Sequence, residues 1–476
     1  MKINEPFIKT IRSPRNYYFY DVNRDTIVQI NRNIYDYLNK KNEFDVLPFE
    51  DQLYINKLLA DGYLSSKHFT KIEHPNTKDL DYQLANRCEQ LILQVTQSCN
   101  LVCYYCPYAN KSNGILQRDH SNKMMSWEIA KSCIDFYAAH SSDNEDANIG
   151  FYGGEPLIAF DLIKKCVEYI EDSFLGKDIH FGITTNGTLV TDEIIAFFHE
   201  HNFNITFSID GPKSVHDVNR KSVDGSGSFD SAINSMKRLV EKYGNQAKSK
   251  ISINMVFNPV NDVDEVISLF NDPFFMVNPI NVMSGLAEDD FLEKDIKITE
   301  AYQAKMRYQY FLGFLDYLNI VDGLKISPPI KSYFYSLEKA YLSYKNPSLE
   351  LPDVGAPGGP CIPGQRRIFS DVNGVFYPCE RVSEVSEVMK IGDIRQGFNL
   401  KKAKAILNIG QITSEECINC FAAIHCKLCA RVADDFDRFS AKKKLQHCSE
   451  TYTSFIDELK NCILIKESRT EYKKAR

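Results

Sequence analysis

The chain has 476 residues, 43% hydrophobic and 25% charged, which is an ordinary composition for a globular protein of about three domains. Its formal net charge of −7 excludes a generally basic surface for nucleic acid. The N-terminal residues lack the apolar stretch of a signal peptide, and no apolar run approaches the roughly 20 residues of a membrane span, so we expect a cytoplasmic protein without nucleic-acid or membrane partners.

Residues 1–85 are predicted to form a small domain that looks like a winged helix. The segment is not basic, which argues against a nucleic-acid reader. It resembles the leader-peptide recognition element fused to maturases of ribosomally synthesised peptides. That resemblance implies that an extended leader adds a strand to the exposed edge of a hairpin, and the alternative is a simple stabilising cap. The expected elements are strands 17–21 and 26–30, helices 31–39 and 49–61, and the strand-like GYLSS at 62–66.

Residues 86–285 alternate short β-rich runs with helical patterns, which is typical of a parallel sheet built from βα units. Such units form either an open sheet or a partial barrel. Ser126, Thr191 and Asp262 are the expected N-caps of three helices. Strands are expected at 91–95, 147–152, 178–184, 204–209, 250–257 and 277–283, and helices at 126–140, 160–174, 191–202, 228–243 and 262–271.

Unusual residues follow four successive strands, at the end where functional residues lie in barrels of this kind. The first group is CNLVCYYC, in which three cysteines are separated by three and then two residues. Three thiolates so spaced suit three corners of a cubane iron–sulfur cluster, whereas a zinc knuckle is the alternative. The residues concerned are Cys99, Cys103 and Cys106, then Gly153-Gly154-Glu155-Pro156, Thr185-Asn186-Gly187, and Ser208 with Asp210-Gly211.

The aromatic residue before the last cysteine and the GGE that follows resemble the radical S-adenosylmethionine (SAM) enzymes. The resemblance implies a [4Fe–4S] cluster on the three cysteines and SAM on its open iron. An electron from a donor such as flavodoxin or ferredoxin would then cleave SAM to a 5′-deoxyadenosyl radical, which abstracts hydrogen from the substrate. A solvated surface arginine is the alternative for Arg220. The implied SAM-binding residues are Tyr105, Gly153, Gly154, Glu155, Asn186, Ser208, Asp210, Arg220 and Asn254.

Residues 286–345 are expected to be helices that close the barrel, and 346–476 to form a cysteine-rich domain that begins with the linker 346–360. A zinc ribbon on the two CxxC pairs, Cys417 with Cys420 and Cys426 with Cys429, is one interpretation. It would leave three further cysteines of this domain unused.

The pattern instead resembles the SPASM extension of radical SAM maturases, which carries two auxiliary [4Fe–4S] clusters. Two residues rather than the usual three precede the sixth cysteine of this pattern, Cys429. By the resemblance, one cluster is held by Cys417, Cys420, Cys426 and Cys448, and the other by Cys361, Cys379 and Cys429.

The second of these clusters is one ligand short, so its open iron could bind a substrate cysteine. The remaining Cys88, Cys133, Cys166 and Cys462 are expected to be small buried residues. We therefore expect a maturase of a ribosomal peptide that forms a thioether, with three [4Fe–4S] clusters in total. Carbon–carbon crosslinking, formylglycine formation in a sulfatase, and a non-enzymatic zinc-ribbon protein are the alternatives. No catalytic general base can be named.

Overall fold

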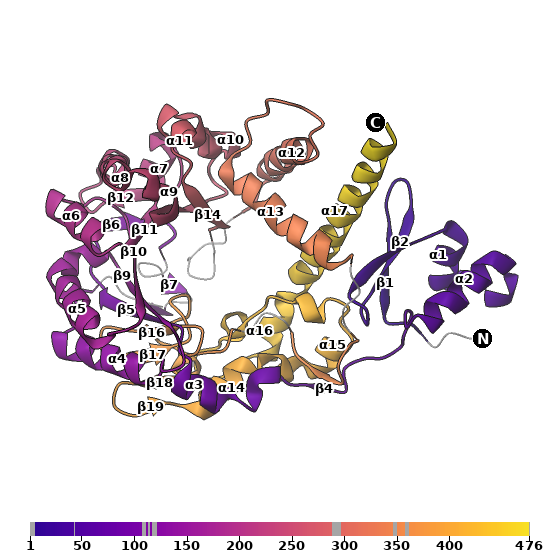
Figure 1. The fold of residues 1–476 in the computed structure, drawn as a ribbon, viewed down its shortest axis with the longest axis horizontal. Helices are drawn as coiled ribbons and strands as arrows, with labels where there is room; N and C mark the ends of the chain where they lie inside the picture. Colours follow the sequence, from indigo (N-terminus) through magenta and orange to yellow (C-terminus); the bar gives the residue numbers. More distant parts are fainter. Residues whose placement is uncertain are drawn as a thin grey trace.

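The computed structural model shows a small N-terminal domain beside the C-terminal helix, and a large sheet flanked by helices at the other end of the molecule (Figure 1). For residues 111–112, 115–116 and 470–475 the structure describes the backbone alone. The structure describes residues 5–41, 43–106, 111–112, 115–116, 121–287, 297–345, 350–357 and 361–475.

The N-terminal domain is a three-stranded antiparallel sheet with two helices. Its strands β1 (Ile8–Arg12), β2 (Tyr17–Asp21) and β3 (Thr26–Ile30) lie in that order, followed by α1 (Arg32–Leu38) and α2 (Phe49–Ala60). The predicted hairpin and both helices are confirmed, whereas β1 was not expected. The strand predicted at 62–66 is wrong, because Leu64 has a positive φ of 58° and its N–H donates to the Asp21 carboxylate at 2.7 Å.

Successive residues of β2 face two different cores. Phe19 packs with residues of α1 and α2, whereas Tyr18 and Tyr20 pack with residues of the C-terminal half of the chain. The Tyr18 hydroxyl donates to Glu467 at 2.9 Å, and Asp25 in the hairpin turn accepts from Tyr20 and pairs with His425, each at 2.7 Å. The N-terminal sheet is therefore held between its own helices and the C-terminal half.

Six parallel strands form the main body of the central sheet, and each pairs with the next along the chain. The alternation of strands and helices predicted for 86–285 is confirmed. The strands are β5 (Gln90–Thr96), β9 (Asp146–Gly153), β10 (Asp178–Thr185), β11 (Asn204–Ser208), β13 (Ile251–Phe257) and β14 (Asn281–Leu286). The connecting helices are α4 (Trp127–Ala139), α5 (Phe160–Ser173), α6 (Asp192–Glu200), α7 (Lys213–Asn219), α8 (Phe229–Tyr243), α9 (Ala247–Lys250), α10 (Val263–Ile267) and α11 (Pro273–Val277).

The predicted caps of these helices are confirmed, since Ser126, Thr191 and Asp262 each accept a backbone N–H of the following turn. The sixth strand begins later than the predicted 277–283. Pro273 opens α11, whose N-cap is the preceding aspartate, and that helix runs to Val277 before the strand can start.

The cysteine-rich part of the chain continues the same sheet. Strand β16 (Ile368–Ser370) pairs in parallel with β5, with Ile368 opposite Leu91. Beyond it the antiparallel strands β17 (Val375–Tyr377), β18 (Gly392–Asp393) and β19 (Gly397–Phe398) complete a ten-stranded mixed sheet.

Helices α12 (Glu300–Tyr317) and α13 (Pro328–Ser343) fill the predicted helical region, and α17 (Cys448–Ala475) extends beyond the helix expected at 449–466. Part of the predicted linker 346–360 lies outside the described residues, and part of it forms β15 (Val354–Gly355), which pairs with β4 (Lys71–Ile72). The other elements are α3 (Leu80–Asn86), β6 (Leu101–Cys103), β7 (Lys111–Ser112), β8 (Ile115–Leu116), β12 (Arg220–Ser222), α14 (Leu400–Leu407), α15 (Ser414–Ile418) and α16 (Ala441–Gln446).

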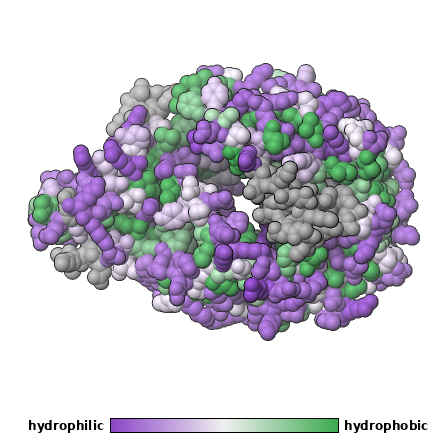
Figure 2. Space-filling view, turned by 180° about the vertical axis from the view of Figure 1, so that it is seen from behind, coloured by the Kyte–Doolittle hydropathy of each residue, from purple (hydrophilic) through white to green (hydrophobic). Residues whose placement is uncertain are grey.

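Within the described part of the chain, every helix is too short or too polar to span a bilayer. Figure 2 shows hydrophobic residues scattered in groups among hydrophilic ones on one face of the molecule.

Candidate functional site

The loop after β5 brings the three predicted cysteines together. Cys99 accepts the Leu101 N–H at 3.4 Å, and β6 places Cys103 opposite Arg220 of β12. Burial raises the pKa of Cys99 to about 12, with smaller contributions from Glu155, Cys103 and Cys106. Three thiols thus share one site at the carboxyl ends of the parallel strands.

Gly153 and Gly154 hold this loop against the end of β9. The Gly154 N–H donates to the Thr96 carbonyl at 3.0 Å, and a Cβ at Gly153 would lie 2.1 Å from that same oxygen. A Cβ at Gly154 would lie 2.3 Å from the Ser98 carbonyl oxygen. Both glycines were expected among the SAM-binding residues, and here they also let two backbone segments approach each other.

Replacing Gly154 by alanine is expected to displace the loop that carries Cys99, because the new methyl group would overlap backbone that has no alternative rotamer. Overpacking of this kind costs about 1–3 kcal/mol, which urea unfolding of the iron-free protein would measure. Gly285→Ala is the control, because a Cβ at Gly285 meets no atom within 4 Å, and it should change the stability by less than about 0.5 kcal/mol. Equal stabilities of the two variants would contradict this account.

Glu155 connects the ends of β9 and β10. Its carboxylate is buried and accepts three protein donors, which are the Leu157 N–H at 3.1 Å, the Thr185 hydroxyl at 2.7 Å and the Asn186 N–H at 2.7 Å. Burial raises the pKa of Glu155 to about 7, although these hydrogen bonds oppose the shift. Glu155, expected among the SAM-binding residues, therefore also organises the protein itself.

Asn186 joins the end of β10 to the cysteine loop. Its amide donates to the Asn100 side chain at 2.9 Å, and its oxygen accepts both the N–H and the hydroxyl of Thr188. Asn100 in turn donates to the Thr188 hydroxyl at 2.8 Å. The residue next to Cys99 is thus fixed by two side-chain hydrogen bonds.

Asp210 and Arg220 form a buried ion pair beside the cysteines. Arg220 Nε and Nη2 lie 2.9 and 3.2 Å from the two carboxylate oxygens, which also accept the Val256 N–H and the Tyr105 hydroxyl. A further guanidinium nitrogen lies 3.9 Å from Cys103 Sγ. Burial tends to lower the pKa of Arg220, but the Asp210 charge holds it well above its usual range.

The alternative of a solvated surface arginine is therefore wrong, because Arg220 is only 7% exposed. Its partner in the structure, Asp210, was also expected among the SAM-binding residues. The guanidinium carbon of Arg220 lies 5.4 Å from the ring centre of Tyr105, a third residue of that expected set.

His216 belongs to this network and was not predicted. Its Nδ1 accepts the Asp210 N–H at 3.4 Å, and its Nε2 lies 3.0 Å from the hydroxyl of Ser228, which donates to the Arg220 carbonyl. Burial, together with the positive charge of Arg220, lowers the pKa of His216 to about 4, so the ring is neutral near pH 7. A lone histidine in HDVNR gives no sequence signal of this role. Ser208 and Asn254 lie opposite each other on β11 and β13.

Within the second cysteine group, electrostatic interactions join two sets of residues. Burial raises the pKa of Cys379 to about 11, with Cys429 among the groups that raise it further, while Cys361 is exposed. The four remaining cysteines are buried, Cys133 in α4, Cys166 in α5, Cys462 in α17 and Cys88 just after α3. The other set comprises Cys417, Cys420, Cys426 and Cys448, each of which interacts electrostatically with at least one other member.

Among the described residues, no three cysteine sulfurs lie as close together as a tetrahedral zinc requires. Sulfurs about 2.3 Å from a tetrahedral zinc lie about 3.8 Å apart, whereas the thiolates of a cubane cluster bind separate irons. Among the described residues, only Asp146, Asp178 and His180 bring three ligand atoms within 4.8 Å of one another. Neither cysteine group has the close packing of a zinc site.

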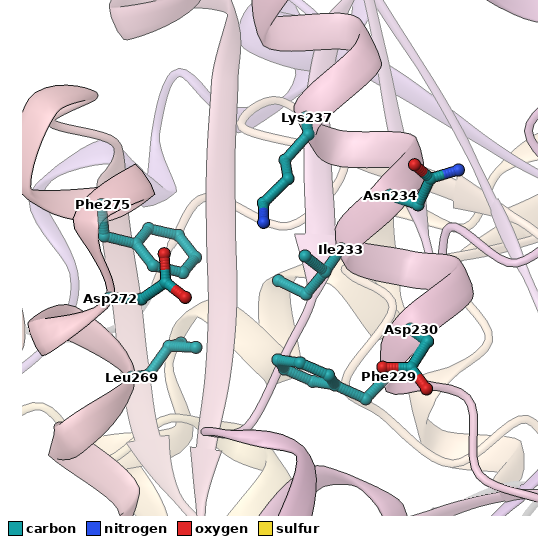
Figure 3. A pocket seen from close by; sticks show the side chains of 8 residues that line it. All are labelled: Phe229, Asp230, Ile233, Asn234, Lys237, Leu269, Asp272 and Phe275. Atoms are coloured by element: carbon teal, nitrogen blue, oxygen red, sulfur yellow. The ribbon is translucent and has the colours of Figure 1, made fainter.

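A separate pocket of about 280 Å³ lies between α8 and α11 (Figure 3). None of the predicted site residues lines it. Its lining residues are Phe229, Asp230, Ile233, Asn234, Lys237, Leu269, Asp272 and Phe275.

Comparison with known proteins identifies relatives of the chain. Residues 93–272 match the family model of the radical SAM superfamily. The serine-type anaerobic sulfatase-maturating enzyme of Bacteroides thetaiotaomicron is 36% identical over 155 residues, which cover 32% of this chain and 36% of that enzyme. This chain thus spans about a third of the length of that relative.

Two further comparisons cover more of the chain. The cysteine-type anaerobic sulfatase-maturating enzyme of Clostridium perfringens is 25% identical over 375 residues, covering 77% of this chain and 95% of that enzyme. The solved structure of native anSMEcpe with bound AdoMet and Cp18Cys peptide has a TM-score of 0.56 and 22% identity, and covers 79% of this chain and 99% of that one. The fold is therefore shared with that structure.

Proposed function

Since this chain is a radical SAM superfamily enzyme, we propose that it is a peptide maturase that links a cysteine sulfur to a carbon of another residue. Membership of this superfamily excludes the alternative of a non-enzymatic zinc-ribbon protein. In this proposal the six parallel strands are a partial (β/α)6 barrel, residues 1–85 recognise the leader of the peptide, and residues 346–476 are a SPASM domain.

Three cysteines, Cys99, Cys103 and Cys106, would hold the SAM-binding [4Fe–4S] cluster. When bound, the cluster and SAM supply a 5′-deoxyadenosyl radical that abstracts a hydrogen atom from the peptide. The protein holds the cysteine loop in place through the contacts of Glu155 and Asn186 at the ends of β9 and β10.

The remaining predicted residues would surround SAM. The backbone of Gly153 and Gly154 would face its methionine part, and Ser208 and Asn254 would lie along the ribose side. The buried pair of Asp210 and Arg220 contacts Tyr105 and would hold its ring for stacking, with the guanidinium beside the cluster.

The N-terminal domain offers two features suited to a peptide. Strands β1 and β3 lie at the two edges of its sheet, and an edge strand can accept an extended peptide by backbone hydrogen bonding. Val46, Phe49 and Leu53 are 76%, 72% and 51% exposed around the start of α2. These side chains would give the leader apolar anchoring positions.

Thioether formation is supported mainly by the set of groups that surround Cys379. Cys429 is among the groups that raise the pKa of Cys379, and the four cysteines outside the cluster sets are buried in hydrophobic cores. A cluster on Cys361, Cys379 and Cys429 would then keep one iron for the thiolate of the substrate. The product has two hydrogens fewer, one lost as a hydrogen atom and one as a proton, and the remaining electron leaves to an iron–sulfur acceptor.

Formylglycine formation is the second candidate. It is favoured by the match to the cysteine-type maturating enzyme, 95% of whose length is covered. That reaction would remove the cysteine sulfur and leave an aldehyde, whereas a thioether retains the sulfur.

The test is anaerobic reconstitution with iron and zinc analysis, followed by mass spectrometry of a candidate precursor peptide incubated with SAM and a strong reductant. About twelve irons per chain are expected for three clusters, with a peptide lighter by two hydrogens whose thiol resists alkylation. Loss of two hydrogens with all thiols still reactive would indicate a carbon–carbon bond. A hydrazine-reactive aldehyde without sulfur would indicate formylglycine, and zinc with little iron would contradict the proposal.

A further inference from the structure

Lys444 of α16 is a buried lysine. It is 1% exposed, and its ammonium donates to the Thr413 hydroxyl at 2.7 Å and to Cys417 Sγ at 3.7 Å. Among the ion pairs of the described residues, none joins Lys444 to a carboxylate. A buried cation is costly without a compensating negative charge nearby, so the surroundings of this ammonium should contain one.

The groups around Lys444 are the thiols of one cysteine set. Thr413 lies 3.3 Å from Cys417 Sγ, so the hydroxyl and the ammonium approach the same sulfur. Burial raises the pKa of both Cys426 and Cys448, and the positive charge of Lys444 opposes that rise at each. The cation therefore acts on three of the four thiols of the set.

We propose that Lys444 is the counter-cation of the auxiliary cluster held by the set of Cys417, Cys420, Cys426 and Cys448, and that its charge raises the reduction potential of this cluster. The inference rests on the proposed function, which assigns a cluster to that set. Because a cluster on four thiolates is anionic and gains one more negative charge on reduction, a fixed cation beside it stabilises the reduced form more than the oxidised one.

The neighbouring Lys443 provides a matched control on the same helix. It is 41% exposed and pairs with the Asp435 carboxylate at 2.9 Å. An exposed ammonium with its own carboxylate partner contributes little field at a buried cluster. Loss of its charge should leave the cluster unaffected.

The experiment is an anaerobic redox titration of the reconstituted full-length enzyme, followed by electron paramagnetic resonance. Lys444→Met and Lys444→Gln should each lower the midpoint potential of one cluster by about 59 mV. For a one-electron reduction this corresponds to about a tenfold change in the reduction equilibrium constant. Lys444→Arg and Lys443→Met should keep the wild-type potential. An unchanged potential in the iron-replete Met variant overturns the inference.

If Lys444→Met does not retain its iron, the midpoint potential of Lys444→Gln tests the inference instead, because the glutamine amide can still donate to Thr413 without carrying a charge. A lowered potential in the Gln variant then supports the inference, whereas a wild-type potential, or loss of iron that also occurs in Lys444→Arg, overturns it. The double variant Cys417→Ala with Cys420→Ala tests the underlying assignment separately, because three of the four cysteines could still hold a cluster after a single substitution. If that variant keeps every cluster signal, the set holds no cluster, and the proposed assignment fails together with the inference.

Discussion

Replacement of Arg220 by methionine is expected to destabilise the protein by about 3–5 kcal/mol, the usual cost of removing one partner from a buried ion pair. The Asp210 side chain is fully buried and that of Arg220 is 9% exposed. Without the guanidinium, the carboxylate would keep only the Tyr105 hydroxyl and the Val256 N–H as donors. A buried charge would be left without a counter-charge.

Urea unfolding of the iron-free protein measures this effect. Arg238→Met is the matched control, because Arg238 pairs with an aspartate, Asp192, whose side chain is 98% exposed, and its loss should cost less than about 1 kcal/mol. The double variant with Asp210→Leu and Arg220→Met should regain much of the stability, since both charges are then gone. A loss for Arg220→Met no larger than that of the control would show that the pair contributes nothing.

Replacement of Cys99 by alanine should remove about four of about twelve irons per chain and reduce 5′-deoxyadenosine formation from SAM to background. The reason is that Cys99 would supply one of only three thiolates to the SAM-binding cluster, and no other cysteine lies on its loop besides Cys103 and Cys106. Iron analysis and chromatographic detection of 5′-deoxyadenosine check the two effects.

Cys166→Ala is the control for this prediction. Cys166 is buried in α5, between apolar residues of the main core, and its removal should leave both the iron content and SAM cleavage intact. If Cys99→Ala kept the full iron content and cleaved SAM, the assignment of the cysteine loop would be wrong.

The sequence predicted the parallel part of the fold well, because its signals are local. Strands β5, β9, β10 and β11 fall within two residues of their predicted bounds, and Ser126, Thr191 and Asp262 cap helices as expected. Such features depend on the period of the hydrophobic residues and on capping side chains within one turn of the helix end. The strands β16 to β19 escaped prediction, because each has only two or three residues and depends on partners remote in the sequence or on tight turns.

The partners inside the site were the least predictable part. Arg220 could be singled out from its position, but its pairing with Asp210 depends on how α7 returns β12 to the cysteine loop. Likewise, the close contacts of Gly153 and Gly154 become visible only once β9 lies beside β5. His216 acquires its neutral, hydrogen-bonded state from burial, which a single sequence does not encode locally.

The pairing of β5 with β16 has a consequence for synthesis on the ribosome. Leu91 leaves the ribosome long before its partner Ile368, so β5 keeps one open edge while most of the protein is still being made. Six of the seven residues of that strand are buried in the finished protein, and an unpaired apolar edge readily recruits other nascent chains. We therefore expect the interval between release of β5 and release of β16 to be the period in which this protein most needs a chaperone.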